Sequence, residues 1–226
     1  MKTAFMMAVL LAALSPATAR AQIKRFWLAP VGGFHTYRLG DVNNEIETIN
    51  AGIAPLHMDD IKSGFGYGVA AGVDLNPAVT LEIAYDRLLG SSKVGDATGS
   101  LEYNLPANEF TARGTFRQAT EATFAVGFGV AAGLVKTAGE VTLGGAPGTG
   151  SLSAHLSGSG PAVEGFASGD WRVSPRFAIT PHIGFRYAKI SETKVEGQVI
   201  HNPDGSNYNL DYSGLATGVR LKLYLN

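Results

Sequence analysis

The sequence predicts an all-β fold, and within that class an antiparallel eight-stranded transmembrane β-barrel. Three observations predict it: apolar residues alternate strictly with small or polar ones, the apolar positions carry no Lys or Glu, and the connections alternate between short and long. A period of two residues indicates extended strands whose two faces lie in different media. Bulky residues on one face and mostly glycine and alanine on the other indicate lipid outside and a narrow interior.

The last strand, over 214–225, shows the pattern most clearly. Its odd positions are apolar apart from one threonine, and its even positions from 214 to 222 are Gly, Ala, Gly, Arg220 and Lys222. A lipid-facing cation at the bilayer midplane costs about 2–4 kcal/mol. We therefore expect Arg220 and Lys222 to point into the barrel.

The same alternation predicts the other strands in order along the chain. A first strand lies near 26–37, and the pattern does not settle which of its positions face inward. The remaining segments are 64–75, 78–86, 110–116, 121–134 and a hairpin over 161–190 that turns at 173–175. Together with the last strand, the count is eight.

The connections alternate in length. Those near 75–77, 118–120 and 173–175 are very short, whereas long polar connections are expected at about 38–63, 89–108, 138–159 and 191–208. Short periplasmic turns and long extracellular loops are typical of bacterial outer-membrane barrels, and an even strand number puts both termini on the short-turn side. A ten-stranded barrel is the alternative if 138–159 forms a hairpin of its own.

The first long connection contains a predicted helix. Ile46, Ile49 and Ile53 recur at helical spacing within 41–53. We expect a short amphipathic helix that rests on the outer rim of the barrel.

Export is predicted by the first 21 residues. Lys2, an apolar run from Ala4 to Leu14 and the small residues of Ala19-Arg20-Ala21 form a cleavable signal peptide, with 22–226 as the barrel domain. The chain has no cysteine, which suits an oxidising compartment. Removal of the signal leaves 16 basic and 19 acidic residues, a formal charge of −3, which argues against nucleic acid as a partner.

The mature sequence resembles the small eight-stranded outer-membrane barrels of the outer-membrane-protein A and X type. Segments 184–189 and 211–225 have the look of the last two strands of that group. The resemblance implies an integral protein of the cell outer membrane, monomeric, whose partners are outer-membrane lipid, lipopolysaccharide and the barrel assembly machinery. We expect a structural or surface-interaction role, with a narrow pore or small-hydrophobe transporter as the alternative and a lipid-modifying enzyme as the weakest candidate.

Inward-facing charges form the main candidate site. They are six acids and four bases: Asp74, Glu82, Asp86, Glu121, Glu164, Asp170, Arg113, Arg186, Arg220 and Lys222. Unpaired buried charge is costly, so we expect these groups to pair, including Glu82 with Arg113 and Glu164 with Arg186. Such a network is a structural plug of salt bridges or, alternatively, a gated narrow pore.

Aromatic residues are expected in two belts at the membrane interfaces. Phe116, Trp171 and Phe177 lie near the predicted short turns. The other belt, near the long-loop ends, comprises Phe65, Tyr67, Tyr85, Phe110 and Tyr187.

No catalytic, cofactor or metal site is predicted. His155-Leu156-Ser157 is similar to the His-x-Ser dyad of lipid A deacylases, but only over this tripeptide, which lies in a Gly/Ser-rich segment expected to be a loop. The five histidines show no ligand spacing, and His182 is expected to face the lumen.

Overall fold

The computed structural model describes residues 25–120, 123–145 and 150–225, so the expected signal peptide at 1–21 lies outside the described residues. Within that part of the chain, eight antiparallel strands form a ring. In order around the ring they are β1 (Arg25–Thr36), β2 (Ser63–Asn76), β3 (Val79–Leu88), β6 (Ala107–Ala119), β7 (Phe124–Gly144), β8 (Ser151–Ser174), β9 (Phe177–Ile190) and β13 (Gly214–Tyr224).

The ring is closed by β13 and β1. Leu28 pairs with Leu223 and Gly33 with Gly218, so no barrel strand is left with an unpaired edge. The predicted eight-stranded barrel is confirmed. The ten-stranded alternative is wrong, because the residues of 138–159 that the structure describes continue β7 and β8 rather than adding two barrel strands.

The pairing settles which face of β1 is inward. Trp27, Ala29 and His35 are buried, whereas Phe26 and Phe34 on the alternate positions are about half exposed. The apolar positions of the other barrel strands are likewise exposed on the outside: Val69, Ile83, Phe128, Val130, Val163, Ile183 and Leu215. The barrel therefore presents its apolar side chains outward.

The two ends of the barrel differ as the sequence predicts. Short connections join β2 to β3, β6 to β7 and β8 to β9 at one end. The first and last described residues lie at the same end, since Tyr224 N donates to Arg176 O at 2.9 Å and Leu225 N donates to Phe26 O at 2.9 Å. The connections at the other end carry further secondary structure.

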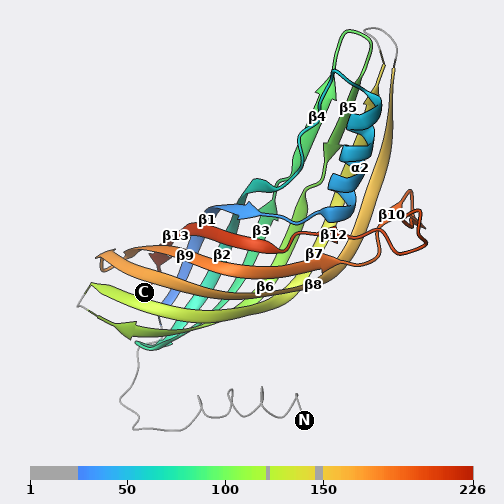
Figure 1. The fold of residues 1–226 in the computed structure, drawn as a ribbon. Helices are drawn as coiled ribbons and strands as arrows, with labels where there is room; N and C mark the ends of the chain where they lie inside the picture. Colours follow the sequence, from blue (N-terminus) through green and yellow to red (C-terminus); the bar gives the residue numbers. More distant parts are fainter. Residues whose placement is uncertain (1–24, 121–122, 146–149, 226) are drawn as a thin grey trace.

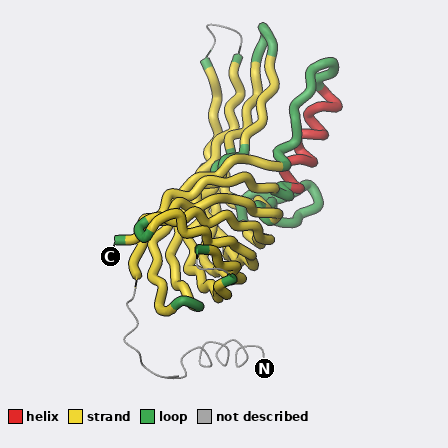
Figure 2. The backbone as a smooth tube through the Cα atoms, turned by 90° about the vertical axis from the view of Figure 1, so that its left-hand side faces the viewer, coloured by secondary structure: helices red, strands yellow, loops and turns green. Residues whose placement is uncertain are grey.

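An extension of the barrel wall rises from this second end (Figures 1 and 2). Beyond Thr137 and before Gly158, β7 and β8 continue as a hairpin. Short strands pair along both of its sides, β4 (Ser91–Gly95) and β5 (Ser100–Asn104) on one and β10 (Lys194–Val195) and β11 (Gln198–Val199) on the other. We call this sheet the arm. The long polar loop expected at 138–159 is wrong over the residues that the structure describes, because they form strand and pair with strands distant in sequence.

The helix α2 (Gly40–Gly52) confirms the predicted helix, but its expected place on the outer rim is wrong. Val42 and Ile46 are fully buried in an apolar cluster with Leu88, Val135 and Leu156, which occupy inward-facing positions at the top of the barrel and on the arm. Burial of each such side chain stabilises the folded state by about 1.5–3 kcal/mol. The helix thus packs over the mouth of the barrel.

The loop between β9 and β13 also lies over the mouth of the barrel. We call this loop and α2 together the cover. It contains β12 (Leu210–Asp211), which pairs with β9. Among the described residues, no helix has the length and apolar character needed to cross a bilayer.

Candidate functional site: a packed lumen beneath an extracellular arm

Charged side chains fill the barrel in tiers. The lowest tier, nearest the short turns, centres on Arg117, which lies 3.1 Å from Asp74 and 2.7 Å from Asp170. Lys222 Nζ lies 3.2 Å from Asp170, and the Tyr224 hydroxyl donates to Asp74 at 3.3 Å. Arg117 therefore links β2 to β8 across the lumen.

The middle tier centres on Arg113. Its Nη2 lies 2.8 Å from Asp86 Oδ2 and 3.6 Å from Glu164 Oε2, and its Nε lies 3.7 Å from Glu82 Oε1. Arg220 Nε shares Glu82 at 3.3 Å. One guanidinium thus meets three carboxylates that come from two other strands.

The upper tier centres on Arg186. Its Nη1 lies 3.4 Å from Glu109 Oε2 and 3.1 Å from His35 Nδ1. Its Nε and Nη2 donate to the backbone oxygen of Tyr212 at 3.2 and 2.9 Å. This tier ties the wall of the barrel to the loop that covers it.

Most residues of the predicted charge network therefore lie together inside the barrel. Glu82 pairs with Arg113 and Lys222 with Asp170, whereas the expected Glu164–Arg186 contact is replaced: Arg186 pairs with Glu109, and Glu164 with Arg113. The two residues do face each other in register on β8 and β9, but the long side chains turn to other partners across the lumen. Glu121 lies outside the described residues.

Sequence reasoning missed Glu109 and Arg117. Both lie on β6 at the same parity as Thr111 and Arg113, so extending the alternation by one position at the start of that strand and one at its end would have found them. Among the described residues, six acids and five bases are buried in the lumen. Their near balance is what a low-dielectric interior requires.

Large side chains fill the space between the tiers. A side-chain carbon at Gly72 would meet the ring of Trp27, and one at Gly129 would meet the ring of Phe166. In each case the glycine is paired with the ring-bearing residue on the adjacent strand, so the ring lies over the glycine. The void beside Glu109, Glu164 and His182 has a volume of about 10 Å³, which is about the minimum for a single water molecule.

Polar contacts lock the cover over the mouth. Asp41 of α2 accepts from Asn209 N at 2.7 Å, and Glu45 accepts from the Tyr208 hydroxyl at 2.8 Å. Burial, reinforced by Glu45, raises the pKa of Tyr208, so this hydroxyl stays protonated as the donor. Tyr212 donates to Leu105 O at 3.1 Å at the bottom of the cover.

The arm carries an apolar groove of about 500 Å³, which we call the arm groove. Its walls come from the C-terminal part of α2 and the following residues on one side and from β4, β5, β7 and β8 on the other, including Ile53, Leu56 and Leu101. Leu143 and Leu152 face each other across the β7–β8 hairpin and are 55% and 74% exposed. These two leucines lie beyond the barrel, where lipid does not cover them.

The His155-Leu156-Ser157 segment lies in strand β8 and not in the expected loop. His155 and Ser157 are exposed on the outward face and Leu156 is buried on the other. The backbone N–H of His155 donates to Glu196, and no hydrogen bond joins the two described side chains of His155 and Ser157. Within the described residues, no group of three or more His, Asp or Glu side chains is arranged to hold a metal ion.

The predicted aromatic residues lie on the outer surface. Phe65, Tyr67, Phe110, Phe116, Trp171, Phe177 and Tyr187 are each about half or more exposed, and Tyr85 is partly buried. Trp171 pairs with Phe124 near the short turns, whereas Phe65 pairs with Phe34 near the opposite end. The structure thus places aromatic pairs at both ends of the wall.

A closed barrel with an apolar exterior and a charged, packed interior is built for a bilayer, because all of its wall hydrogen bonds are internal and its outer side chains match lipid. The chain is an integral outer-membrane β-barrel.

No protein-family model and no curated protein matches the sequence. Solved structures of similar fold include Neisserial surface protein A (14% identity, TM-score 0.45, covering 88% of this chain and 96% of that one) and the outer membrane protein OprG from Pseudomonas aeruginosa (10%, 0.42, 90% and 94%). The outer membrane protease OmpT from Escherichia coli is similar at 10% identity and TM-score 0.44, over 93% of this chain and 99% of that one. The strand pairing itself, not these likenesses, defines the fold.

Proposed function

We propose that the protein is a surface-interaction protein, in which a non-conducting barrel holds the arm above the outer membrane and the arm groove binds an apolar ligand or an apolar segment of a partner. The observation that carries the proposal is the exposure of Leu143 and Leu152 in that groove. Exposed apolar patches on water-facing surfaces mark interaction sites.

The packed lumen supports a role outside the barrel. Three tiers of paired charges and the rings of Trp27 and Phe166 occupy its cross-section. Above them, Tyr212, Leu105 and α2 cover the mouth. A narrow pore or transporter requires rearrangement of all these layers, so we rank it second.

The construction of the arm also supports the proposal. Strands β7 and β8 run without interruption from the charged tiers to the arm groove, over 21 and 24 residues. A membrane-spanning strand needs only about 9–11 residues. The additional length holds the groove at a fixed distance from the bilayer, which suits a contact surface.

The proposal is tested by titrating 1-decanol, a sparingly soluble apolar probe, into methyl-labelled protein in lipid nanodiscs. The leucine methyl signals of Leu143 and Leu152 should shift saturably. Leu215, which faces lipid on β13 and lines neither this groove nor any other described pocket, serves as the internal reference for simple partitioning. The variant Leu152→Ser should weaken the saturable shift at Leu143.

Two results would contradict the proposal. One is a linear shift at Leu143 and Leu152 that matches the shift at Leu215, because it would mean partitioning without a site. The other is stepwise single-channel conductance of the purified protein in a planar bilayer, which would favour the pore.

A further inference from the structure

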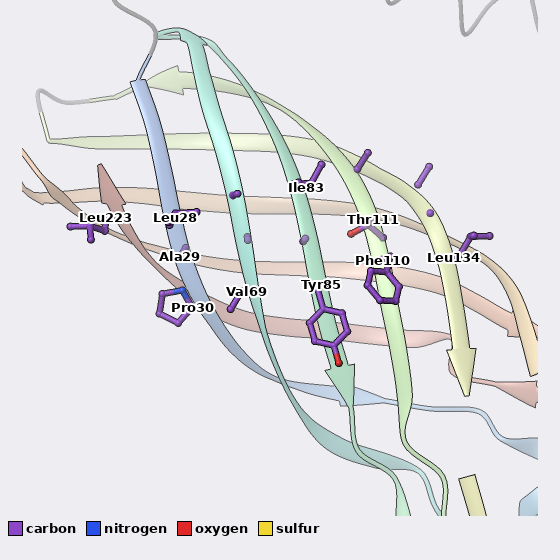
Figure 3. A pocket seen from close by; sticks show the side chains of 16 residues that line it. Leu28, Ala29, Pro30, Val69, Ile83, Tyr85, Phe110, Thr111, Leu134 and Leu223 are labelled. Carbon is purple, nitrogen blue, oxygen red and sulfur yellow. The ribbon is translucent and has the colours of Figure 1, made fainter. Parts of the chain in front are cut away.

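A second apolar groove, which shares no lining residue with the arm groove, lies on the lipid-facing wall. Figure 3 shows it from close by. We call it the lateral groove. It has a volume of about 710 Å³ and crosses the outer faces of β1, β2, β3, β6 and β7. That volume falls within the roughly 300–1,000 Å³ typical of small-molecule sites.

The hollow arises from side-chain size along one line of paired residues. Ala71, Ile83, Ala112 and Ala132 are paired in succession across four strands, so three of the four positions carry only a methyl group. The next line toward the extracellular end, Val69, Tyr85, Phe110 and Leu134, is bulky. Within this line, the centroids of the Tyr85 and Phe110 rings lie 5.0 Å apart.

A polar line follows directly above. Tyr67, Arg87, Asn108 and Lys136 are paired in succession on the same four strands and point outward. They lie two residues, about 7 Å, beyond the bulky line. Asn108 Oδ1 accepts from the Tyr85 hydroxyl at 2.8 Å and from Arg87 Nη1 at 3.5 Å, so the amide fixes both neighbours at the edge of the groove.

Among the residues that the structure describes, the two cations of this line have no counter-ion. Within the described residues, neither Arg87 nor Lys136 takes part in an ion pair, and no acid occupies an outward position of β3 or β6. The outward acid of β7, Glu140, lies four residues, about 13 Å, beyond Lys136. Arg87 and Lys136 are two strand spacings, about 10 Å, apart.

We propose that the lateral groove and the polar line together bind a phosphorylated, acylated glycolipid of the lipopolysaccharide type. Its acyl chains would lie along the alanine line, and its phosphate would sit between Arg87 and Lys136 at the extracellular interface. Arginine donates paired hydrogen bonds to phosphate oxygens, and lysine adds a second positive charge. The site is independent of the arm groove.

The test is native mass spectrometry of the full chain in detergent with rough-type lipopolysaccharide, scored against phosphatidylcholine. The double variant Arg87→Gln/Lys136→Gln should weaken lipopolysaccharide binding by about tenfold or more, because charge-assisted hydrogen bonds to phosphate are lost. The matched control is Lys189→Gln, which removes an outward-facing cation from β9 on another part of the wall and should change nothing. Ala112→Phe, which fills the hollow, should weaken binding while Ala112→Ser does not.

Three outcomes would overturn the proposal. They are unchanged binding by the double variant, equal binding of phosphatidylcholine, and full competition by deacylated lipopolysaccharide, which would show that the groove takes no part. A heat-dependent gel shift verifies that each variant is a folded barrel, and the substitutions face lipid, so failure to fold would not mimic the expected result.

Discussion

Replacing Arg113 with methionine should destabilise the barrel strongly. The guanidinium is 4% exposed and lies within 4 Å of Asp86, Glu82 and Glu164. Methionine retains much of the volume and removes the charge. Three buried carboxylates would then share only Arg220, which contacts Glu82 at 3.3 Å.

The expected magnitude follows from the cost of a broken buried pair. Removing one partner of such a pair costs about 3–5 kcal/mol, because it leaves uncompensated charge in a low-dielectric interior. The matched control is Lys93→Met, which breaks the arm pair Lys93–Glu102 at 3.0 Å, with both side chains substantially exposed. Exposed pairs contribute about 0–1 kcal/mol, so the control should lose at most that.

Urea unfolding in lipid vesicles, followed by tryptophan fluorescence, measures the difference. Trp27 lies in the lumen and Trp171 on the lipid face, so the signal reports both sides of the wall. Adding Asp86→Asn to Arg113→Met should recover part of the loss, since one unpaired charge disappears. If Arg113→Met loses no more free energy of unfolding than Lys93→Met, the idea that the tiers hold the barrel together is refuted.

Three further predictions concern other layers of the structure. Gly129→Val should cost about 1–3 kcal/mol by forcing a side chain against the ring of Phe166, whereas Gly165→Ala, which meets nothing within 4 Å, should be neutral in the same unfolding assay. Ile46→Asp should release α2 by burying an unpaired charge, seen as rapid protease cleavage of the cover while the heat-dependent gel shift persists; an intact cover would mean that Ile46 does not anchor the helix. Tyr208→Phe should remove about 1 kcal/mol of local stability with its 2.8 Å hydrogen bond to Glu45, measured as faster amide exchange in α2, and unchanged exchange would show that this bond does not hold the loop.

The barrel was predictable because the side chain at each strand position matches the medium that it faces. Alternation along β7 or β13 records lipid on one side and a crowded lumen on the other, and this information is local. The arm was not predictable in the same way. Beyond Thr137 both faces of the β7–β8 hairpin leave the bilayer, and its Gly- and Ser-rich residues become strand through pairing with β5 and β10, which are distant in sequence.

The sequence predicts which charged residues lie in the lumen better than it predicts which of them form ion pairs. Parity alone places Glu164 and Arg186 inside the barrel, and register places them opposite each other. Their partners, however, depend on reach: Arg113 on β6 extends across the lumen to Glu164 on β8, and Arg186 on β9 extends to Glu109 on β6. Such contacts depend on the diameter of the barrel and the bulk of rings such as Phe166, which no single strand encodes.

The tiers and the arm are parts of one mechanical unit. Arg117 joins β2 to β8, Arg113 joins β3 and β8 to β6, and Arg186 joins β9 to β6, so each guanidinium fixes strands that are not neighbours in the wall. Cross-links of this kind resist both widening of the lumen and sliding of the strands. Because β7 and β8 pass from these tiers directly into the arm, the charges that fill the lumen also lie at the base of the arm groove. The proposed function therefore depends on one set of ion pairs both for the packed lumen and for the position of the external surface.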